Sequence, residues 1–212
     1  MYLSRIELDI YNRKKMRDLK DLNSIHGFVE SCFPEEIREG KRTRKLWRID
    51  NLKNKKYLII LSEGRPDCQK IEKYAVKGSY ETKDYDQFLD KLEEGMKARF
   101  RIKMNTVKAK LSKDNSKRGR IVPVADEELS KFFLDRTEKN GFSVGIDEFG
   151  IFEKELLPYK TVGKQQYNLV SASFEGNLMI IDHEKIKESL TKGIGKKKAY
   201  GFGLLTIIPY EK

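Results

Sequence analysis

A glycine-rich segment near the end of the chain, GIGKKKAYGFGLLTI from Gly193 to Ile207, contains residues suited to binding chemistry. Glycine lets backbone N–H groups approach a ligand closely and adopt positive φ, and the lysines add positive charge beside them. Such a segment can bind an anion such as a phosphate, although a plain turn between a helix and a final strand is the alternative. The candidate contacts are Gly193, Gly195, Lys196, Lys197, Lys198, Gly201 and Gly203.

Histidine is the second candidate for chemistry, and the chain has only two. An imidazole with an ordinary pKa of about 6.5 suits proton transfer near neutrality. His26 sits in a predicted helix beside Gly27, which leaves room for a ligand. An ordinary half-buried histidine is the alternative for His26, and that ordinary interpretation is preferred for His183.

The sequence contains no metal-binding constellation, no Walker loop and no nucleophile elbow. We therefore expect an activity without metal or cofactor. RNA cleavage fits this expectation because RNA supplies its own nucleophile, the 2′-OH. A protein need only move protons and stabilise charge on the phosphate.

Composition favours a polyanionic partner. The 212 residues carry 44 lysines and arginines against 33 acids, a net charge of +11. Nucleic acid is the first candidate partner and an anionic membrane surface the second. The sequence has no apolar run long enough to span a bilayer and no signal-peptide pattern. Cys32 and Cys68 are too few for a disulfide framework or zinc site, so a cytoplasmic protein is expected.

The first half predicts the element order β-α-β-β-α-β. It comprises a strand over 2–10, a helix over 23–33, strands over 46–50 and 57–61, a short helix after Pro66 and a strand near 74–80. A linking helix over 84–95 follows.

The second half repeats this order. In the strand over 97–104, Lys97, Arg99, Arg101 and Lys103 alternate with apolar residues, so period two places the four cations on one face. The remaining elements are a loop over 108–120, a helix over 126–140, strands over 142–152 and 166–174, a turn at 175–177, a continuing strand over 178–181, a helix over 183–192 and a strand over 204–209. The predicted fold class is α+β, with two tandem ferredoxin-like (RRM-like) domains over 1–83 and 96–212 joined by residues 84–95.

Several segments together resemble one family, the CasE family of CRISPR RNA-processing endoribonucleases of type I-E systems. These segments are MYLSRIEL, IHGFVESCFP, LWRID, FRIKMN, RIVPV, SFEGNLMIID and the glycine-rich end, and they run from Met1 to Pro209. The glycine-rich end is the most specific of them.

The resemblance assigns roles to individual residues. His26 matches the catalytic histidine, and Lys198 matches the one lysine kept in the glycine-rich segment. The family's RNA-contacting strand and basic hairpin correspond here to Arg101, Lys103 and Asn105, and to Lys160 and Lys164. Family members carry a tyrosine three positions before the histidine and, in some, a lysine five positions after it. Because this chain has Asn23 and Ser31 there, the residues assisting His26 stay open among Asn23, Ser24, Ser31 and a lysine from elsewhere.

The resemblance also implies a substrate and partners. The family cuts precursor CRISPR RNA beside the repeat hairpin, keeps hold of the product and joins the type I-E interference complex (Cascade). The alternative is a non-catalytic RNA-binding scaffold of the same fold. A DNA-binding regulator is disfavoured because neither long helix has the composition of a recognition helix.

Overall fold

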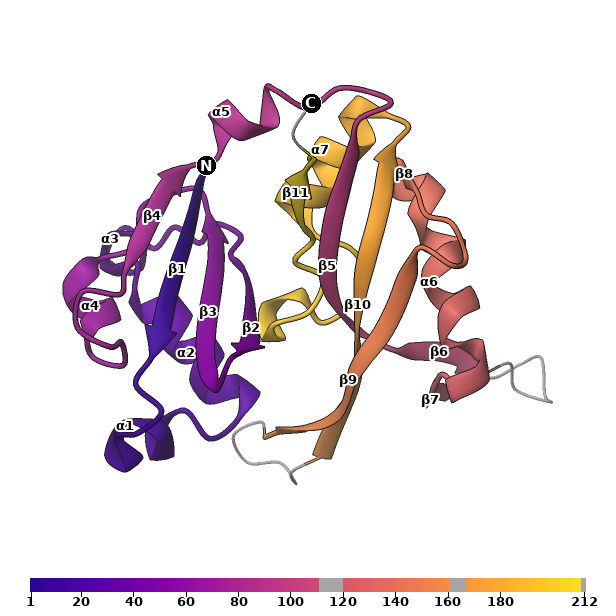
Figure 1. Cartoon of the computed structure of the whole chain (residues 1–212). Coiled ribbons are helices and arrows are strands. Elements are labelled where there is room, and N and C mark those ends of the chain that lie inside the picture. Colours follow the sequence, from indigo (N-terminus) through magenta and orange to yellow (C-terminus); the bar gives the residue numbers. More distant parts are fainter. Residues whose placement is uncertain (111–119, 161–166, 211–212) are drawn as a thin grey trace.

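A computed structural model describes residues 1–110, 120–160 and 167–210. In the first half, an antiparallel sheet has the strand order β2-β3-β1-β4, with its helices to one side (Figure 1). The elements are β1 (Tyr2–Leu8), α1 (Arg13–Asp18), α2 (Leu22–Ser31), α3 (Pro34–Arg38), β2 (Leu46–Leu52), β3 (Lys55–Ser62), α4 (Cys68–Glu72) and β4 (Glu81–Asp84).

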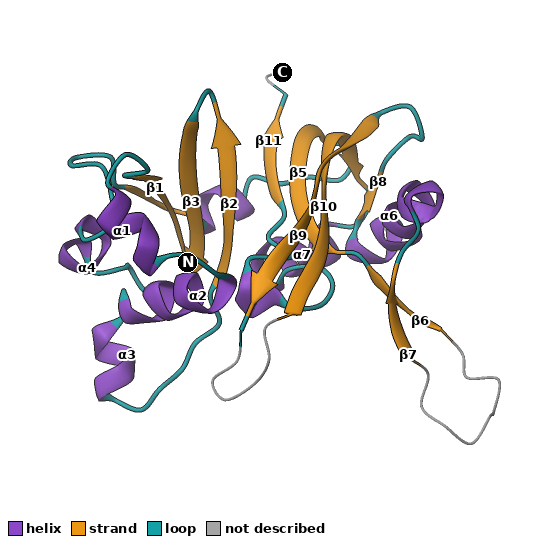
Figure 2. Ribbon diagram, turned by 90° about the horizontal axis from the view of Figure 1, so that it is seen from below, coloured by secondary structure: helices purple, strands orange, loops and turns teal. Residues whose placement is uncertain are grey.

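In the second half, the sheet has the order β11-β5-β10-β8, with β9 also paired to β10. Figure 2 shows this sheet beside the first one, with the small β6–β7 hairpin extending away from it. The elements are α5 (Asp86–Leu89), β5 (Lys97–Asn105), β6 (Val107–Lys110), β7 (Arg120–Pro123), η1 (Asp126–Glu128), α6 (Leu129–Thr137), η2 (Glu138–Asn140), β8 (Phe142–Ser143), β9 (Phe149–Tyr159), β10 (Tyr167–Ile180), α7 (His183–Lys192), η3 (Lys198–Tyr200) and β11 (Thr206–Pro209).

Both sheets have the strand order of a ferredoxin-like unit, in which the last strand lies beside the first and the third beside the second. The predicted α+β class with tandem ferredoxin-like folds is confirmed. The boundaries at 83/84 and 95/96 stay a prediction. Leu46 and Leu61 of the first sheet pack into the core of the second half, so the two halves share apolar packing.

The helix that carries His26 forms for clear local reasons. Asp21 caps α2 by accepting a hydrogen bond from the Ser24 N–H at 2.8 Å, which satisfies a free donor at the helix start. Leu22, Ile25, Phe28 and Val29 recur at helical spacing and are all buried. This apolar stripe holds α2 against the first sheet and leaves His26 at the edge of the stripe.

Three predicted elements of the chain are wrong in part. The strand expected near 74–80 lies instead at Glu81–Asp84, because Tyr74 and Ala75 end the α4 segment in the core and Ala75 makes only an isolated bridge to Leu8. The linking helix is helical only over Asp86–Leu89. The expected loop over 108–120 has paired ends, β6 and β7, while its centre lies outside the described residues.

The strands around β10 also differ from the prediction. Residues 142–152 are split into β8 and β9 because Glu148 closes a turn, its side chain accepting from the Gly145 N–H at 3.0 Å. No turn interrupts β10 at 175–177. Gly176 serves close strand packing instead, since a Cβ there would lie 2.1 Å from the Glu148 carbonyl oxygen.

Strand β2 joins the two halves through a buried arginine. Arg48 donates from Nη1 to the carbonyl oxygens of Arg101 at 2.9 Å and Leu204 at 2.8 Å, and from Nη2 to Thr206 Oγ1 at 2.9 Å. Its charge is matched by Asp50 on the same strand, at 2.6 Å from Nε. Arg48 thereby fixes β2 against β5 and the start of β11. No helix in the described ranges is long and apolar enough to cross a membrane.

We expect Arg48→Met to destabilise the fold by about 3–5 kcal/mol, because the partly buried Asp50 loses its ion pair at 2.6 Å and keeps only Arg101 at 3.9 Å, and the Leu204 carbonyl oxygen loses a charged donor. Urea unfolding measures this change. The control is Arg5→Met, whose side chain is half exposed and pairs with Glu81 on the surface; it should cost less than about 1 kcal/mol. Equal losses in the two variants would contradict the bridging role of Arg48.

Candidate functional site

His26 faces an open cleft of about 780 Å³ between α2, the segment that leads into β2 and the glycine-rich segment. Its side chain is 21% exposed, so the imidazole is shielded yet reachable. The cleft is lined by His26, Glu30, Arg42, Thr43, Arg44, Lys45, Gly195, Lys197, Lys198, Ala199 and Tyr200. Among these described residues, five carry positive charge and only Glu30 carries negative charge.

Two side chains touch the imidazole. Glu30 follows His26 by one helical turn, and its Oε1 lies 3.9 Å from His26 Nδ1. The ring of Tyr200 meets the His26 ring edge to face, with 5.4 Å between the ring centroids. The Tyr200 hydroxyl in turn shares a hydrogen bond of 3.0 Å with the Tyr159 hydroxyl. The histidine is therefore fixed from two sides, by its own helix and by the second half of the chain.

The environment of His26 favours its neutral form. Burial lowers the pKa of His26 below its ordinary value of 6.5, and the charges of Arg42 and Lys45 lower it further, while Glu30 acts in the opposite direction. A histidine that is neutral near pH 7 can accept a proton, which is the requirement for a general base.

Glu30 also organises the cations of the cleft. Arg42 Nε lies 3.3 Å from Glu30 Oε2, and Lys45 Nζ lies 3.7 Å from the same atom. Lys45 is buried and bonds mainly to Glu36, at 2.6 Å. The Arg42 side chain is 70% exposed, so Arg42 can turn toward an anion in the cleft while Lys45 stays in the protein.

Tyr200 and Lys197 form the opposite wall. The Lys197 ammonium lies over the rings of Tyr159 and Tyr200, at 5.1 and 5.5 Å from their centroids. The hydrogen bond with Tyr159, together with burial, raises the pKa of Tyr200 to about 12. Tyr200 therefore keeps its proton at neutral pH and is not a base for the reaction.

The glycines of the segment have mainly a packing role. Gly193, Gly201 and Gly203 are buried, and a Cβ on Gly201 would lie 2.6 Å from the Trp47 ring. The N–H groups of Ile194 and Gly203 bond to the carbonyl oxygens of Gly203 and Lys103, so they are not available to a ligand. Of the four glycines in the segment, Gly195 alone lines the cleft.

The three lysines lie in different places. Lys196 is exposed and lies outside the cleft lining, whereas Lys197 lines the cleft. Lys198 donates from Nζ to the carbonyl oxygens of Lys192 at 2.8 Å and Gly193 at 2.6 Å. Lys198 thus caps the negative end of α7, and burial lowers its pKa.

The basic strand is not part of the His26 cleft. Arg101 pairs with Glu175, Lys103 is buried and pairs with Glu155, and Asn105 donates to the Val170 carbonyl oxygen at 2.7 Å. These partners lie on β9 and β10, and Arg101 also lies 3.9 Å from Asp50 on β2 of the first half. Lys160 is exposed at the end of β9, and Lys164 lies outside the described residues.

Of the residues considered as assistants of His26, Asn23, Ser24 and Ser31 do not line its cleft, whereas lysines from other segments do, namely Lys45, Lys197 and Lys198. Ser24 Oγ donates to Asp21 at 2.8 Å and Ser31 Oγ to the Phe28 carbonyl oxygen at 2.7 Å; Asn23 is half-buried on α2. The residues in contact with His26 are Glu30 and Tyr200. The four-residue spacing on one helix could have indicated Glu30, whereas nothing in the sequence indicates the approach of Tyr200.

The described residues contain no group of three or more His, Cys, Asp or Glu side chains that could hold a metal ion. The cleft combines an imidazole whose pKa is lowered with five cationic side chains. That arrangement suits the transfer of a proton next to a bound phosphate.

Comparison with known proteins identifies the family. A model of the family described as CRISPR associated protein matches residues 1–209. The chain belongs to this family. It is 26% identical over 220 residues to the CRISPR-associated endoribonuclease Cse3 of Thermus thermophilus, across 99% of this chain and 100% of that protein.

Solved structures agree with this assignment. A structure of the CRISPR endoribonuclease Cse3 bound to a 19 nt RNA matches with a TM-score of 0.81 and 25% identity, covering 99% of this chain and 100% of that one. Thermus thermophilus Cse3 bound to an RNA representing a pre-cleavage complex matches with a TM-score of 0.79 and 25% identity, over 98% of each chain. The resemblance to the CasE family is confirmed.

Because Glu30 is the group that raises the pKa of His26, we expect Glu30→Gln to lower this pKa further. NMR titration of the imidazole Cε1–H signals measures it directly, and the second histidine, His183 on α7, serves as a reference within the same molecule. A His26 pKa that stays constant or rises would show that Glu30 is not coupled to the imidazole.

Removing the Lys198 ammonium should destabilise the end of α7. We expect Lys198→Ala to cost about 1 kcal/mol, because a charged donor to two terminal carbonyl groups is lost, and to lower Tm by about 2–4 °C. Lys196→Ala is the matched control and should melt like the parent protein. A Tm unchanged by Lys198→Ala would contradict the capping role.

Proposed function

We propose that this chain is a metal-independent endoribonuclease that cuts precursor CRISPR RNA beside the repeat hairpin, with His26 as its acid–base residue. The observation that carries the proposal is the position of His26, half-buried and shifted toward its neutral form at the wall of a cleft with five cations. The family membership and the RNA-bound Cse3 relatives support the substrate class.

The proposed reaction uses only groups present in the cleft and the RNA. Neutral His26 removes the proton from the 2′-OH, whose oxygen attacks the adjacent phosphorus. The bond from phosphorus to the 5′-oxygen breaks, and that oxygen receives the proton from the imidazolium. The products are a 2′,3′-cyclic phosphate and a 5′-hydroxyl.

Arg42 and Lys197 are the proposed phosphate contacts in the cleft. Negative charge grows on the phosphate oxygens as the 2′-oxygen attacks, and cations in contact with those oxygens stabilise that charge. Gly195 lets the backbone of the same segment approach the phosphate. Arg101 and Lys160 remain proposed contacts for more distant parts of the RNA, whereas Lys103 and Asn105 are buried and their side chains already bond to Glu155 and to the Val170 carbonyl oxygen.

The proposal extends to partners. As in the CasE family, the protein would retain the cleaved repeat hairpin and join the subunits of the type I-E interference complex. We place it in the cytoplasm, in keeping with Cys32 and Cys68, which are both free cysteines. The ferredoxin-like domain with the histidine helix would span 1–83, and the domain with the glycine-rich segment 96–212.

His26→Ala should slow cleavage by at least ~10²-fold, the lower end for general acid–base catalysis, while RNA affinity stays close to that of the parent. Single-turnover cleavage of a panel of repeat hairpin RNAs, with mapping of both product ends, measures the rate and the cut site. His183→Ala, remote from the cleft, is the control and should cleave normally. A fully active His26→Ala protein would refute the assignment.

The same panel separates catalysis from a scaffold role and tests the metal requirement. Cleavage should persist in EDTA, because the chemistry described above uses a neutral imidazole and cationic side chains. If the parent protein binds hairpins but cuts none, it is a scaffold and the proposed function fails. Cleavage that disappears in EDTA and returns only with magnesium would contradict the proposed mechanism.

A further inference from the structure

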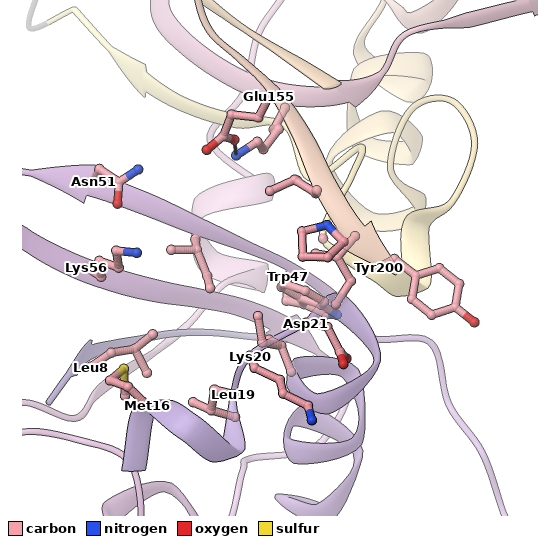
Figure 3. Close-up of a pocket in the computed structure, with 17 residues that line it drawn as sticks. Leu8, Met16, Leu19, Lys20, Asp21, Trp47, Asn51, Lys56, Glu155 and Tyr200 are labelled. Atoms are coloured by element: carbon pink, nitrogen blue, oxygen red, sulfur yellow. Dashed lines mark hydrogen bonds and ion pairs between the residues drawn. The ribbon is translucent and has the colours of Figure 1, made fainter. Parts of the chain in front are cut away.

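A second cavity, of about 220 Å³, shares Tyr200 with the His26 cleft, and Figure 3 shows Tyr200 at its edge. It is enclosed by the first two helices and β2 on one side and by β9 on the other. Its lining includes Leu19, Ile25, Trp47, Ile49, Leu157 and Tyr200. The mechanism described above does not use this cavity.

The chemistry of the cavity suits a flat group with a polar edge. Its walls are apolar, and Figure 3 shows the polar side chains of Lys20, Asn51 and Lys56 around its border and Glu155 across from them. Lys20, Asn51 and Lys56 are exposed. An apolar pocket with a few polar groups that fix orientation is the usual form of a small heterocycle site.

The charges at the mouth indicate what that heterocycle is attached to. Lys20 and Lys56 carry positive charge there, and the acid Asp21 is engaged in capping α2. Glu155, the remaining acid, is paired with Lys103. A base within a phosphate-linked strand would thus find apolar walls for its ring and cations for the phosphates on either side.

The cavity adjoins the proposed reaction site at α2 and at Tyr200. Ile25 of α2 lines the cavity, and the next residue, His26, lines the cleft. The Tyr200 ring borders both spaces, and its hydroxyl points away from the cavity in Figure 3. An RNA strand with a phosphate beside His26 therefore passes Tyr200 to reach the mouth of the cavity.

We propose that this cavity binds one unstacked nucleobase of the RNA, from a nucleotide close to the one that is cut. The inference rests on the proposed function and adds a base-binding subsite to it. The bound base would hold the RNA strand at a fixed distance from His26, because Ile25, which lines the cavity, and His26 are neighbours on the same helix.

The matched pair Leu157→Trp and Leu156→Trp tests the proposal. Leu157 is partly buried and lines the cavity, whereas its neighbour Leu156 is 65% exposed and does not. Leu157→Trp fills the cavity, and Leu156→Trp adds the same ring outside it. Ile49→Phe, which fills the cavity from β2, is a second variant if Leu157→Trp fails to fold.

The probe is a hairpin RNA cleaved in the panel above, made uncleavable with a 2′-deoxy group at the cut and carrying one abasic nucleotide at successive positions. We expect one position to weaken binding to the parent protein and to Leu156→Trp by about tenfold, within the range of base–aromatic stacking. Leu157→Trp should bind the intact RNA about tenfold more weakly, with no further loss from the abasic nucleotide, because both changes remove the same contact.

Two outcomes would overturn the subsite. Either no abasic position weakens binding, or the abasic loss remains undiminished in the cavity-filled variant. Both outcomes can occur while the parent protein still cleaves the intact hairpin. They would therefore contradict the base-binding subsite without contradicting the proposed function. Absence of cleavage of every hairpin by the parent protein defeats the proposed function itself.

Discussion

The contact between Trp47 and the glycine-rich segment is the constraint on which the site depends. The indole N–H donates to the Ala199 carbonyl oxygen at 3.0 Å, and its ring fills the space that a side chain at Gly201 would need. Tyr200 lies between these two anchored residues, so its ring is placed against His26. Figure 1 shows the segment from Gly193 beside β2, where the two halves meet. This contact fixes the glycine-rich segment beside α2 and so places the wall of the cleft that faces His26.

The electrostatics of the cleft couple proton binding to anion binding. Arg42 and Lys45 lower the pKa of His26 in the free protein, and the same positive charge attracts a phosphate. A bound phosphate brings negative charge next to the imidazole, which raises its pKa again. In the proposed reaction, the free protein would therefore present a base, and the bound phosphate would stabilise the imidazolium that forms once the 2′-OH has been deprotonated. Glu30 acts in the opposite direction and keeps the pKa of His26 in the free protein from falling further.

The spacing of apolar and charged residues along the sequence predicted the fold well and the candidate site only in part. The alternation of β5 placed Ala98 and Phe100 in the core, and both are buried there. The same alternation could not reveal that Arg101 and Lys103 pair with Glu175 and Glu155, because those partners depend on the pairing of distant strands. His26 was identifiable from its residue type. Arg42 lies in a basic stretch without periodicity, and only the folded chain brings it to His26.

The glycine-rich segment illustrates how a motif can mark function through packing. Its glycines were expected to expose N–H groups to phosphate, yet Gly201 and Gly203 meet Trp47 and the Ile194 backbone. The glycines hold in place the stretch from Lys197 to Tyr200, and this stretch lines the cleft. Lys197 adopts a left-handed conformation, with φ of 60°, and its ammonium lies over two tyrosine rings. Such a conformation is costly for lysine and persists only where its surroundings hold it. The close packing of the glycines thus fixes a cation and an aromatic ring on the wall opposite His26.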